Sequence, residues 1–362
     1  MALCNPSIRM LTMMTSSTPP PKLSVILPVR NEEPHIARVL NELLAQSLPE
    51  QGYELLVVDG MSTDRTREIV RDIAERHACV RLLDNPGCLS GRARNVGVAQ
   101  AKAPYVLFVD GHCRILSDDM LSSVLAAFRN GARCISRPQP LFAETGNRFQ
   151  HAVTLARGTV LGHYAGSEIF QPDDHWCSPQ SAGCGYEKDL YLELGGVDED
   201  FDAAEDLEFN LRVAQHGIQA RHCQTFAVGY MARSGVRDLF RQLYRYGYGR
   251  ARTARKHPSS FSPLVGLLSL FVVILGVFPV LALAVPLLGV LWCLTAGVYA
   301  GLVLLVSLWG SRSSLMDSPF VASALAAIHL GGGLGYLMGL LGGPSWCHAP
   351  PECSESAASH SS

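Results

Sequence analysis

The sequence has little charge overall and no basic surplus. Charged residues make up 17% of the 362 positions, and the formal net charge is −2. A duplex-binding protein usually carries a strong positive excess, so we expect no nucleic acid partner. The eleven cysteines contain no Cys-x-x-Cys pair and no regular spacing, which predicts reduced thiols rather than a disulfide framework. His175, Cys177 and Cys184 are expected to be ordinary buried or loop residues, and a structural zinc site formed by them is the minor alternative.

The longest region without charge lies near the C-terminal end. Residues 264–309 contain no Asp, Glu, Lys, Arg or His. One membrane crossing takes about 20 apolar residues, so this region is long enough for two crossings, with Pro286 at the turn. A third apolar region, 320–341, is interrupted only by His329. We therefore predict a membrane domain of two to three helices.

Two common nucleotide-binding motifs are also missing. No Gly-x-Gly-x-x-Gly follows the first predicted strand, and no Walker-type motif occurs, which disfavours dinucleotide dehydrogenases and P-loop enzymes. What is present is an alternation of short β-branched runs and helical apolar spacing. We predict strands at 23–29, 53–58, 79–83 and 105–109, separated by helices at 35–46, 62–77 and 91–101. This order predicts an α/β fold with a mixed, mostly parallel sheet.

Polar residues follow three of these strands. Asn31 and Glu32 follow the first, Asp59 ends the second, and Asp110 with His112 follows the fourth. In such sheets the functional site lies at the carboxyl ends of the strands. A carboxylate and an imidazole two residues apart can face one divalent cation, directly or through water, although a strand ending in Asp-Gly is often only a turn.

Five segments in a fixed order carry a family resemblance. They are LPVRNEE at 27–33, VVDGMSTDRT at 57–66, GRARNVG at 91–97, VDGH at 109–112 and EDLEF at 205–209. Together they resemble the inverting family 2 glycosyltransferases with the GT-A fold, over about residues 22–255. The third position of the Asp-x-Asp metal motif is histidine here, which is similar to the bacterial succinoglycan and exopolysaccharide glucosyltransferase subgroup.

The resemblance implies a nucleoside diphosphate sugar as donor and a divalent cation, Mg²⁺ or Mn²⁺, as cofactor. Asp110 and His112 would be the metal ligands. Asp59 matches the residue that contacts the nucleotide base, and Arg94 matches a basic residue near the nucleotide, with a structural salt bridge as its alternative. The residues implied in nucleotide-sugar binding are Pro28, Asn31, Glu32, Asp59, Arg94, Asp110 and Arg250.

Asp206 corresponds to the catalytic base of the family, and Glu205 would orient the acceptor or couple to its titration. The alternative for Asp206 is an acidic residue favoured by the helix dipole. In an inverting displacement the base removes a proton from the acceptor hydroxyl as its oxygen attacks the anomeric carbon. The acceptor side is expected to include His175, Trp176 and Gly183, with core packing as the alternative for Trp176.

A basic segment precedes the apolar regions. From Arg233 to Lys256 there are seven Arg and one Lys against Asp238 alone. Arginines recur every four residues from Arg233 to Arg245, opposite an apolar face, which predicts an amphipathic helix on an anionic membrane surface; a merely solvated helix is the alternative. Residues 246–250 occupy the place of a Gln-x-x-Arg-Trp motif in processive relatives, but the tryptophan is missing. We interpret them as a gating or diphosphate-contacting loop with Arg250 as the candidate contact.

This charge next to the first crossing predicts a cytoplasmic catalytic domain. The resemblance to bacterial enzymes implies a multi-pass protein of the bacterial inner membrane. The expected function is transfer of a hexose such as glucose to a membrane-lipid-linked saccharide acceptor, in exopolysaccharide or cell-envelope glycan biosynthesis. A processive polysaccharide synthase and a non-catalytic nucleotide-sugar-binding membrane scaffold are the alternatives. The predicted segments are a disordered N-terminus (1–21), a GT-A domain (22–232), a basic amphipathic interfacial segment (233–262), a membrane domain (263–343) and a disordered tail (344–362).

Overall fold

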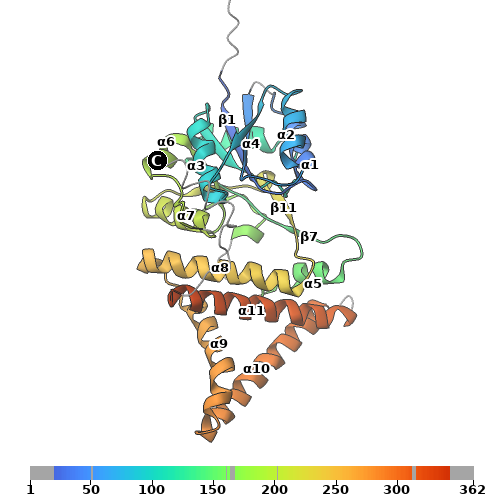
Figure 1. The fold of residues 1–362 in the computed structure, drawn as a ribbon, viewed down its shortest axis with the longest axis vertical. Coiled ribbons are helices and arrows are strands. Elements are labelled where there is room, and N and C mark those ends of the chain that lie inside the picture. Colours follow the sequence, from blue (N-terminus) through green and yellow to red (C-terminus); the bar gives the residue numbers. More distant parts are fainter. Residues whose placement is uncertain are drawn as a thin grey trace, which may run out of the picture.

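The computed structural model describes residues 20–49, 52–159, 161–163, 168–201, 203–311 and 315–342. The expected disordered ends lie almost entirely outside these residues. An α/β domain occupies one end of the molecule, two long helices run beneath it, and a helical hairpin projects away from it (Figure 1).

The α/β domain is built on an eight-stranded sheet with the order β3-β2-β1-β4-β9-β6-β10-β8. Strands β1, β2, β3 and β4 are parallel to one another, and β6 is parallel to β10. In contrast, β9 is antiparallel to both β4 and β6, and β8 is antiparallel to β10. The predicted mixed, mostly parallel sheet is therefore confirmed. The strands are β1 (Leu23–Val29), β2 (Tyr53–Asp59), β3 (Val80–Asp84), β4 (Tyr105–Phe108), β6 (Cys134–Ser136), β8 (His175–Cys177), β9 (Gly183–Glu187) and β10 (Ala220–His222).

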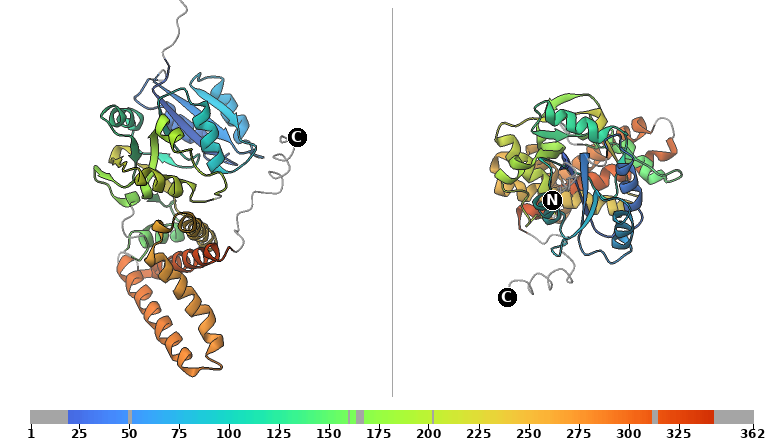
Figure 2. Two further views of the ribbon diagram at one scale, coloured as in Figure 1. Left: turned by 90° about the vertical axis from the view of Figure 1, so that its left-hand side faces the viewer. Right: turned by 90° about the horizontal axis from the view of Figure 1, so that it is seen from above.

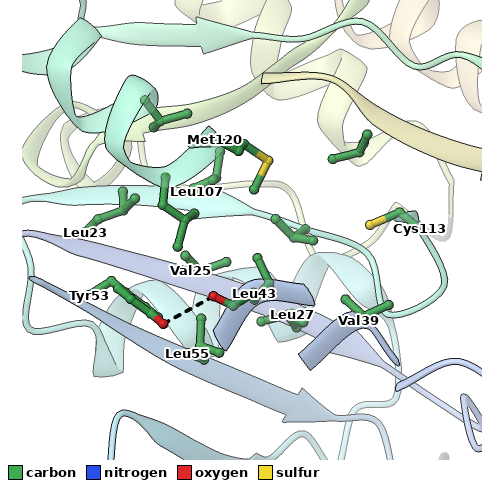
Figure 3. Close-up of a cluster of buried hydrophobic side chains, with 14 of the residues drawn as sticks. Leu23, Val25, Leu27, Val39, Leu43, Tyr53, Leu55, Leu107, Cys113 and Met120 are labelled. Carbon is green, nitrogen blue, oxygen red and sulfur yellow. Dashed lines mark hydrogen bonds between the residues drawn. The ribbon is translucent and has the colours of Figure 1, made fainter. Parts of the chain in front are cut away.

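Helices cover both faces of this sheet. Successive residues of a strand point to opposite faces, and in β1 Val25 and Leu27 belong to one buried cluster whereas Ile26 belongs to another. Figure 3 shows the first cluster, where the Tyr53 hydroxyl satisfies its polar end by donating to the Leu43 carbonyl at 3.2 Å. One face carries α1 (Ile36–Leu44), α2 (Thr66–Ala74) and α4 (Met120–Arg129), and the other carries α3 (Ser90–Gln100), α6 (Lys188–Glu193) and α7 (Glu205–Gln215).

A second, small sheet has the order β5-β11-β7. Its strands are β5 (Arg114–Ile115), β11 (Val228–Met231) and β7 (Leu141–Phe142). Because β5 begins two residues after His112, this sheet brings β11 close to the end of β4.

The remaining long helices form the membrane-side part of the chain. They are α5 (Arg148–Arg157), α8 (Val236–Lys256), α9 (Pro263–Leu281), α10 (Pro286–Gly310) and α11 (Ser318–Leu340). Three segments are long and apolar enough to cross a membrane: Pro263–Leu281, Pro286–Gly310 and Leu315–Leu340. Only 11% of the first and 6% of the second are buried inside the protein, whereas 56% of the third is buried.

The structure corrects three expectations. Residues 246–250 are not a loop, because they lie inside α8. The apolar face of α8 is not free for lipid, since Leu239 packs in one buried cluster with residues of α5 and α11. Cys88 is disulfide-bonded, although seven other cysteines of the described residues are free thiols, as expected.

Candidate active site

The Asp110-Gly111-His112 turn follows β4 at the carboxyl edge of the parallel strands. Gly111 is required there by space, because a Cβ at this position would lie 2.7 Å from Val29 Cγ1 and 3.2 Å from Glu32 Cγ. The tight fit lets the turn pass over the end of β1. It thereby places Asp110 and His112 beside the loop that holds Glu32.

Asp110 is held as a carboxylate. Its Oδ2 accepts a hydrogen bond of 2.5 Å from the Tyr230 hydroxyl, and its Oδ1 lies 3.9 Å from the Arg94 guanidinium. Burial alone would raise the pKa of Asp110, but the charges of His112 and Arg94 and the Tyr230 hydrogen bond outweigh it and lower that pKa. Asp110 is therefore ionised at neutral pH.

His112 contacts Glu32 through Nδ1, at 3.0 Å from Oε1. Burial lowers the pKa of His112, but this hydrogen bond and the charge of Asp110 raise it above its usual value. A carboxylate accepts the Nδ1 proton, so Nε2 carries the lone pair in the neutral ring. A carboxylate behind one nitrogen, with the other nitrogen available, is the usual arrangement of a metal-binding histidine.

These residues fit a divalent cation. Asp110 offers an ionised oxygen, Oδ1, that accepts no hydrogen bond from the described residues. His112 keeps 42% of its side chain exposed. One carboxylate with one imidazole is compatible with Mn²⁺ and, through water, with Mg²⁺.

The loop after β1 is joined to the loop after β2. The backbone amide of Asn31 donates to Ser62 Oγ at 2.9 Å, and that of Glu32 donates to Thr66 Oγ1 at 2.8 Å. Asp59 is fully buried, and it accepts from Arg67 at 2.7 Å and from the Ser62 hydroxyl at 2.5 Å. Pro28 lies opposite Val58 in the β1–β2 register. Four predicted residues, Pro28, Asn31, Glu32 and Asp59, thus share one rim.

Arg94 joins this rim to a distant part of the chain. It projects from α3, contacts Glu205 Oε1 directly, and keeps only 12% of its side chain exposed. Burial lowers the pKa of Arg94, but the negative charges of Glu205, Asp206 and Asp110 outweigh this effect and raise it. A single buried cation therefore holds the end of β4 and the start of α7 together. The salt bridge foreseen as an alternative for Arg94 is present.

Asp206 lies in the first turn of α7, and its helix begins after an unusual residue. Ala204 has a φ of +63°, which turns the chain sharply into the helix. Glu205 is buried and accepts from Ser90 and Arg94, whereas Asp206 is exposed to solvent. Dense protein surroundings and the charge of Glu205 raise the pKa of Asp206, although Arg94 opposes them. A carboxylate with a raised pKa is a stronger base than a free aspartate.

The predicted acceptor residues lie at different places. Gly183 is in β9, next to β4, and packs against Asn210 of α7. His175 and Trp176 are in β8, which is separated from β4 by three strands. Trp176 is 49% exposed, so core packing is wrong for it. Arg250 lies in α8, and its role as a diphosphate contact stays a prediction.

A second group of ligand-type atoms includes two of the three residues considered for zinc. His175 Nε2 lies 2.9 Å from Glu168 Oε2, and Cys177 Sγ completes a group whose atoms lie within 4.8 Å of one another. Glu168 takes the place that the sequence suggested for Cys184. A hydrogen bond between His175 and Glu168 accounts for this arrangement without an ion.

Sequence reasoning missed Tyr230, Ser90 and Arg137. Tyr230 reaches Asp110 only through the second sheet, for which the sequence holds no distinct signal. Arg137 directly follows β6. Because β6 and β4 are both antiparallel to β9, they end at the same edge of the sheet. The polar residue after this strand, Arg137, is therefore the signal in the sequence that could have indicated a site residue.

Comparison with known proteins agrees with this geometry. Residues 24–186 match the family model for glycosyl transferase family 2. The chain is 29% identical over 335 residues to the succinoglycan biosynthesis protein ExoA of Rhizobium meliloti, covering 88% of this chain and 94% of that protein. It is 24% identical over 243 residues to a dolichyl N-acetyl-alpha-D-glucosaminyl phosphate 3-beta-D-2,3-diacetamido-2,3-dideoxy-beta-D-glucuronosyltransferase of Methanococcus voltae, covering 65% of this chain and 74% of that protein.

Among solved structures, the mannosyltransferase PcManGT of Pyrobaculum calidifontis, in complex with GDP-Man and Mn²⁺, has a TM-score of 0.51 at 19% identity. The match covers 86% of this chain and 88% of the PcManGT chain. This likeness concerns the fold. The chain therefore carries a glycosyl transferase family 2 domain with the GT-A fold, and it is a glycosyltransferase.

Proposed function

We propose that this glycosyltransferase moves a hexose, with inversion, from a nucleoside diphosphate sugar to a membrane-lipid-linked saccharide. The main support for this proposal is the position of Arg94, which lies 3.9 Å from Asp110 and contacts Glu205. It brings an ionised carboxylate suited to a cation next to the start of α7, which also carries Asp206, the carboxylate proposed as the base. An inverting displacement needs these two groups on either side of one anomeric carbon.

In this reaction Asp206 accepts the proton of the acceptor hydroxyl. The acceptor oxygen forms a bond to the anomeric carbon while the bond from that carbon to the diphosphate oxygen breaks. The nucleoside diphosphate leaves with the bonding electrons, and the configuration inverts. Glu205 stays bound to Ser90 and Arg94, so its charge keeps the pKa of Asp206 raised and strengthens Asp206 as a base.

The donor would lie along the rim formed by the ends of β1, β2 and β4. Asp59 would hold the base, with Pro28, Asn31 and Glu32 lining the nucleotide. Asp110 and His112 would hold Mg²⁺ or Mn²⁺, which when bound supplies positive charge to the diphosphate. Arg94 adds a fixed positive charge on the same side.

The acceptor class follows from the position of the domain. The catalytic domain lies on α8 and α11, next to two apolar helices of which only 11% and 6% are buried inside the protein. An acceptor in the bilayer surface would reach Asp206 from that side. The names of the two relatives, one in succinoglycan biosynthesis and one acting on a dolichyl-linked sugar phosphate, agree with a lipid-linked acceptor in exopolysaccharide or envelope glycan synthesis. Gly183 is the predicted acceptor contact nearest β4.

The arginines of α8 support attachment to the inner face of a bacterial membrane. Arg237 and Arg241 are exposed, so they remain available to anionic lipid although the apolar face of α8 is covered. Positive charge beside a first crossing favours a cytoplasmic catalytic domain.

The test is to incubate membranes that contain the full chain with radiolabelled nucleotide sugars, Mn²⁺ and a bacterial lipid extract. We expect label in a short, solvent-extractable glycolipid. Long insoluble polymer would instead identify a processive synthase, and donor binding without any transfer would identify a scaffold.

A further inference from the structure

Arg137 is a buried cation without full hydrogen bonding. Its relative exposure is 4%, and its Nε and Nη1 atoms have no hydrogen-bond partner among the described residues. Buried polar groups are almost always paired, and an unpaired buried charge costs several kcal/mol. The site must therefore compensate this charge in another way.

Part of the compensation comes from Asp110. Burial lowers the pKa of Arg137, but interactions with Cys184, Tyr230, Cys113 and Asp110 outweigh it and keep the guanidinium charged. Asp110 itself is shared with Arg94 and Tyr230. Two guanidinium groups thus share one carboxylate, so Asp110 compensates the charge of Arg137 only in part.

We propose that Arg137 binds a phosphate oxygen of a substrate in the active site. The planar guanidinium offers its donors as a fork that matches a phosphate. Arg137 leaves the sheet at the same edge as Asp110, where the donor diphosphate is expected. This proposal rests on the proposed function, and the phosphate could belong to the donor or to a lipid-phosphate acceptor.

The experiment uses the full chain in detergent with two variants, Arg137→Gln and Arg137→Lys. The matched control is Arg133→Gln, because Arg133 precedes the same strand but is 48% exposed and paired with Glu187 at 2.6 Å. Isothermal titration would compare nucleoside diphosphates of the four bases with the corresponding nucleosides, and transfer assays would give the KM for the lipid extract.

For a donor contact, Arg137→Gln weakens diphosphate binding roughly ten- to a hundredfold and leaves nucleoside binding unchanged. For an acceptor contact, diphosphate binding is unchanged while the acceptor KM rises by a similar factor. Arg137→Lys should restore part of either loss, which a purely structural role would not require. Unchanged values for both substrates would overturn the proposal. A wild-type chain that binds no nucleoside diphosphate would reject the proposed function as well.

A separate observation concerns α11, which lies along α8 with backbone contact. A Cβ at Gly331 would lie 2.7 Å from the Phe240 carbonyl oxygen, one at Gly335 would overlap the Tyr244 carbonyl, and one at Gly339 would lie 2.8 Å from the Tyr248 carbonyl. The glycines of α11 and the residues that they contact in α8 both advance by four positions, in the same direction along the chain. The two helices are therefore parallel and packed through a glycine stripe.

Both ends of α11 are also tied to the neighbouring helices α5 and α8. Asp317, just before the helix, pairs with Arg148 of α5 at 2.8 Å. Near the other end, Arg255 of α8 donates to the Gly339 carbonyl at 3.3 Å. Figures 1 and 2 show that α8 and α11 run across the direction of the α9–α10 hairpin.

We infer that α11 lies in the plane of the membrane surface and does not cross it. Its 23 residues would span about 34 Å, long enough for a bilayer, but both its ends lie at the level of α8. The chain then crosses twice, through α9 and α10. Leu340, at the end of α11, then lies on the same side of the membrane as the catalytic domain. This inference assumes the proposed membrane attachment.

The test places one epitope tag at a time in the full chain: before Met1, between Leu283 and Ala284, or after Ser362. Protease is added to sealed inside-out and right-side-out membrane vesicles. We expect the two terminal tags to be cut in the same vesicles and the middle tag in the opposite ones. Terminal tags with opposite responses would mean a third crossing and overturn the inference. Three tags cut in both vesicle types would show that the chain does not cross at all.

The glycine stripe offers a matched pair for the packing itself. Gly335→Ala must push α11 from α8, whereas a Cβ at Gly332 meets nothing within 4 Å. In detergent we expect Gly335→Ala to lower the Tm by several degrees and Gly332→Ala to leave it unchanged or raise it slightly. Equal effects of the two substitutions would refute the backbone contact.

Discussion

Replacing Arg94 with methionine perturbs the residue that joins the two halves of the site. The substitution keeps an apolar stem but removes the charge next to Glu205, Asp206 and Asp110. At the 3.9 Å that separates Arg94 from Asp110, one pair of unit charges is worth about 4 kcal/mol at an effective dielectric constant of about 20. Removing one partner of a buried pair typically costs about 3–5 kcal/mol, because the other charge is left uncompensated.

We therefore expect Arg94→Met to lower the Tm in detergent by roughly 10 °C. The matched control is Arg92→Met in the same helix. Arg92 is 45% exposed, and its nearest carboxylate, Glu199, is 3.9 Å away. Exposed pairs contribute at most about 1 kcal/mol, so the control should change the Tm little.

The same substitution should change the pH dependence of transfer. Arg94 lowers the pKa of Asp206, so its removal raises that pKa further. The base works only when deprotonated, and the acidic limb of kcat/KM should therefore move upward by roughly one pH unit. A variant with wild-type Tm and an unmoved acidic limb would refute the assigned role of Arg94.

Three further predictions concern the end of β4. Tyr230→Phe removes the 2.5 Å hydrogen bond to Asp110 and thereby raises the pKa of Asp110. In a titration of the transfer rate with Mn²⁺, we expect roughly tenfold weaker activation, and an unchanged titration would contradict this. Gly111→Ala should abolish transfer, because the added Cβ would lie 2.7 Å from Val29 Cγ1. The control Gly131→Ala should retain activity, because its Cβ would meet nothing within 4 Å and only the backbone strain of a positive φ would lower stability. Chelation and Asp110→Asn should each stop turnover, and Mn²⁺ should restore only the chelated wild type; a fully active chelated enzyme would exclude the cation.

The sequence predicted the sheet well because β1, β2 and β4 are buried, β-branched runs that end in polar residues. The position of Asp110 at a strand end followed from that pattern alone. The contact of Arg94 with Glu205 joins residues 111 positions apart, and no local spacing specifies it. Tyr230 was missed for the same reason.

The membrane-side helices show a different limit. The pattern of α8 predicted that its apolar face would lie on the membrane, but an apolar face does not specify whether lipid or protein covers it. Leu239 packs in a cluster shared with α11, whose glycines permit a close approach that hydropathy does not record. Likewise, two glycines made residues 246–250 look like a loop, although these residues lie inside a helix. The glycines are there for close packing, since a Cβ at Gly249 would lie 2.6 Å from the Ala203 carbonyl oxygen.

The most direct test of the account is the transfer rate of Asp206→Asn beside its donor affinity. Asparagine keeps the size of the side chain but cannot take a proton. We predict a loss of roughly 10²–10⁴-fold in kcat, with nucleoside diphosphate affinity within about twofold of wild type. Asp189→Asn, an exposed position in α6, should be unaffected. Transfer by Asp206→Asn at the wild-type rate would contradict the assignment of the base.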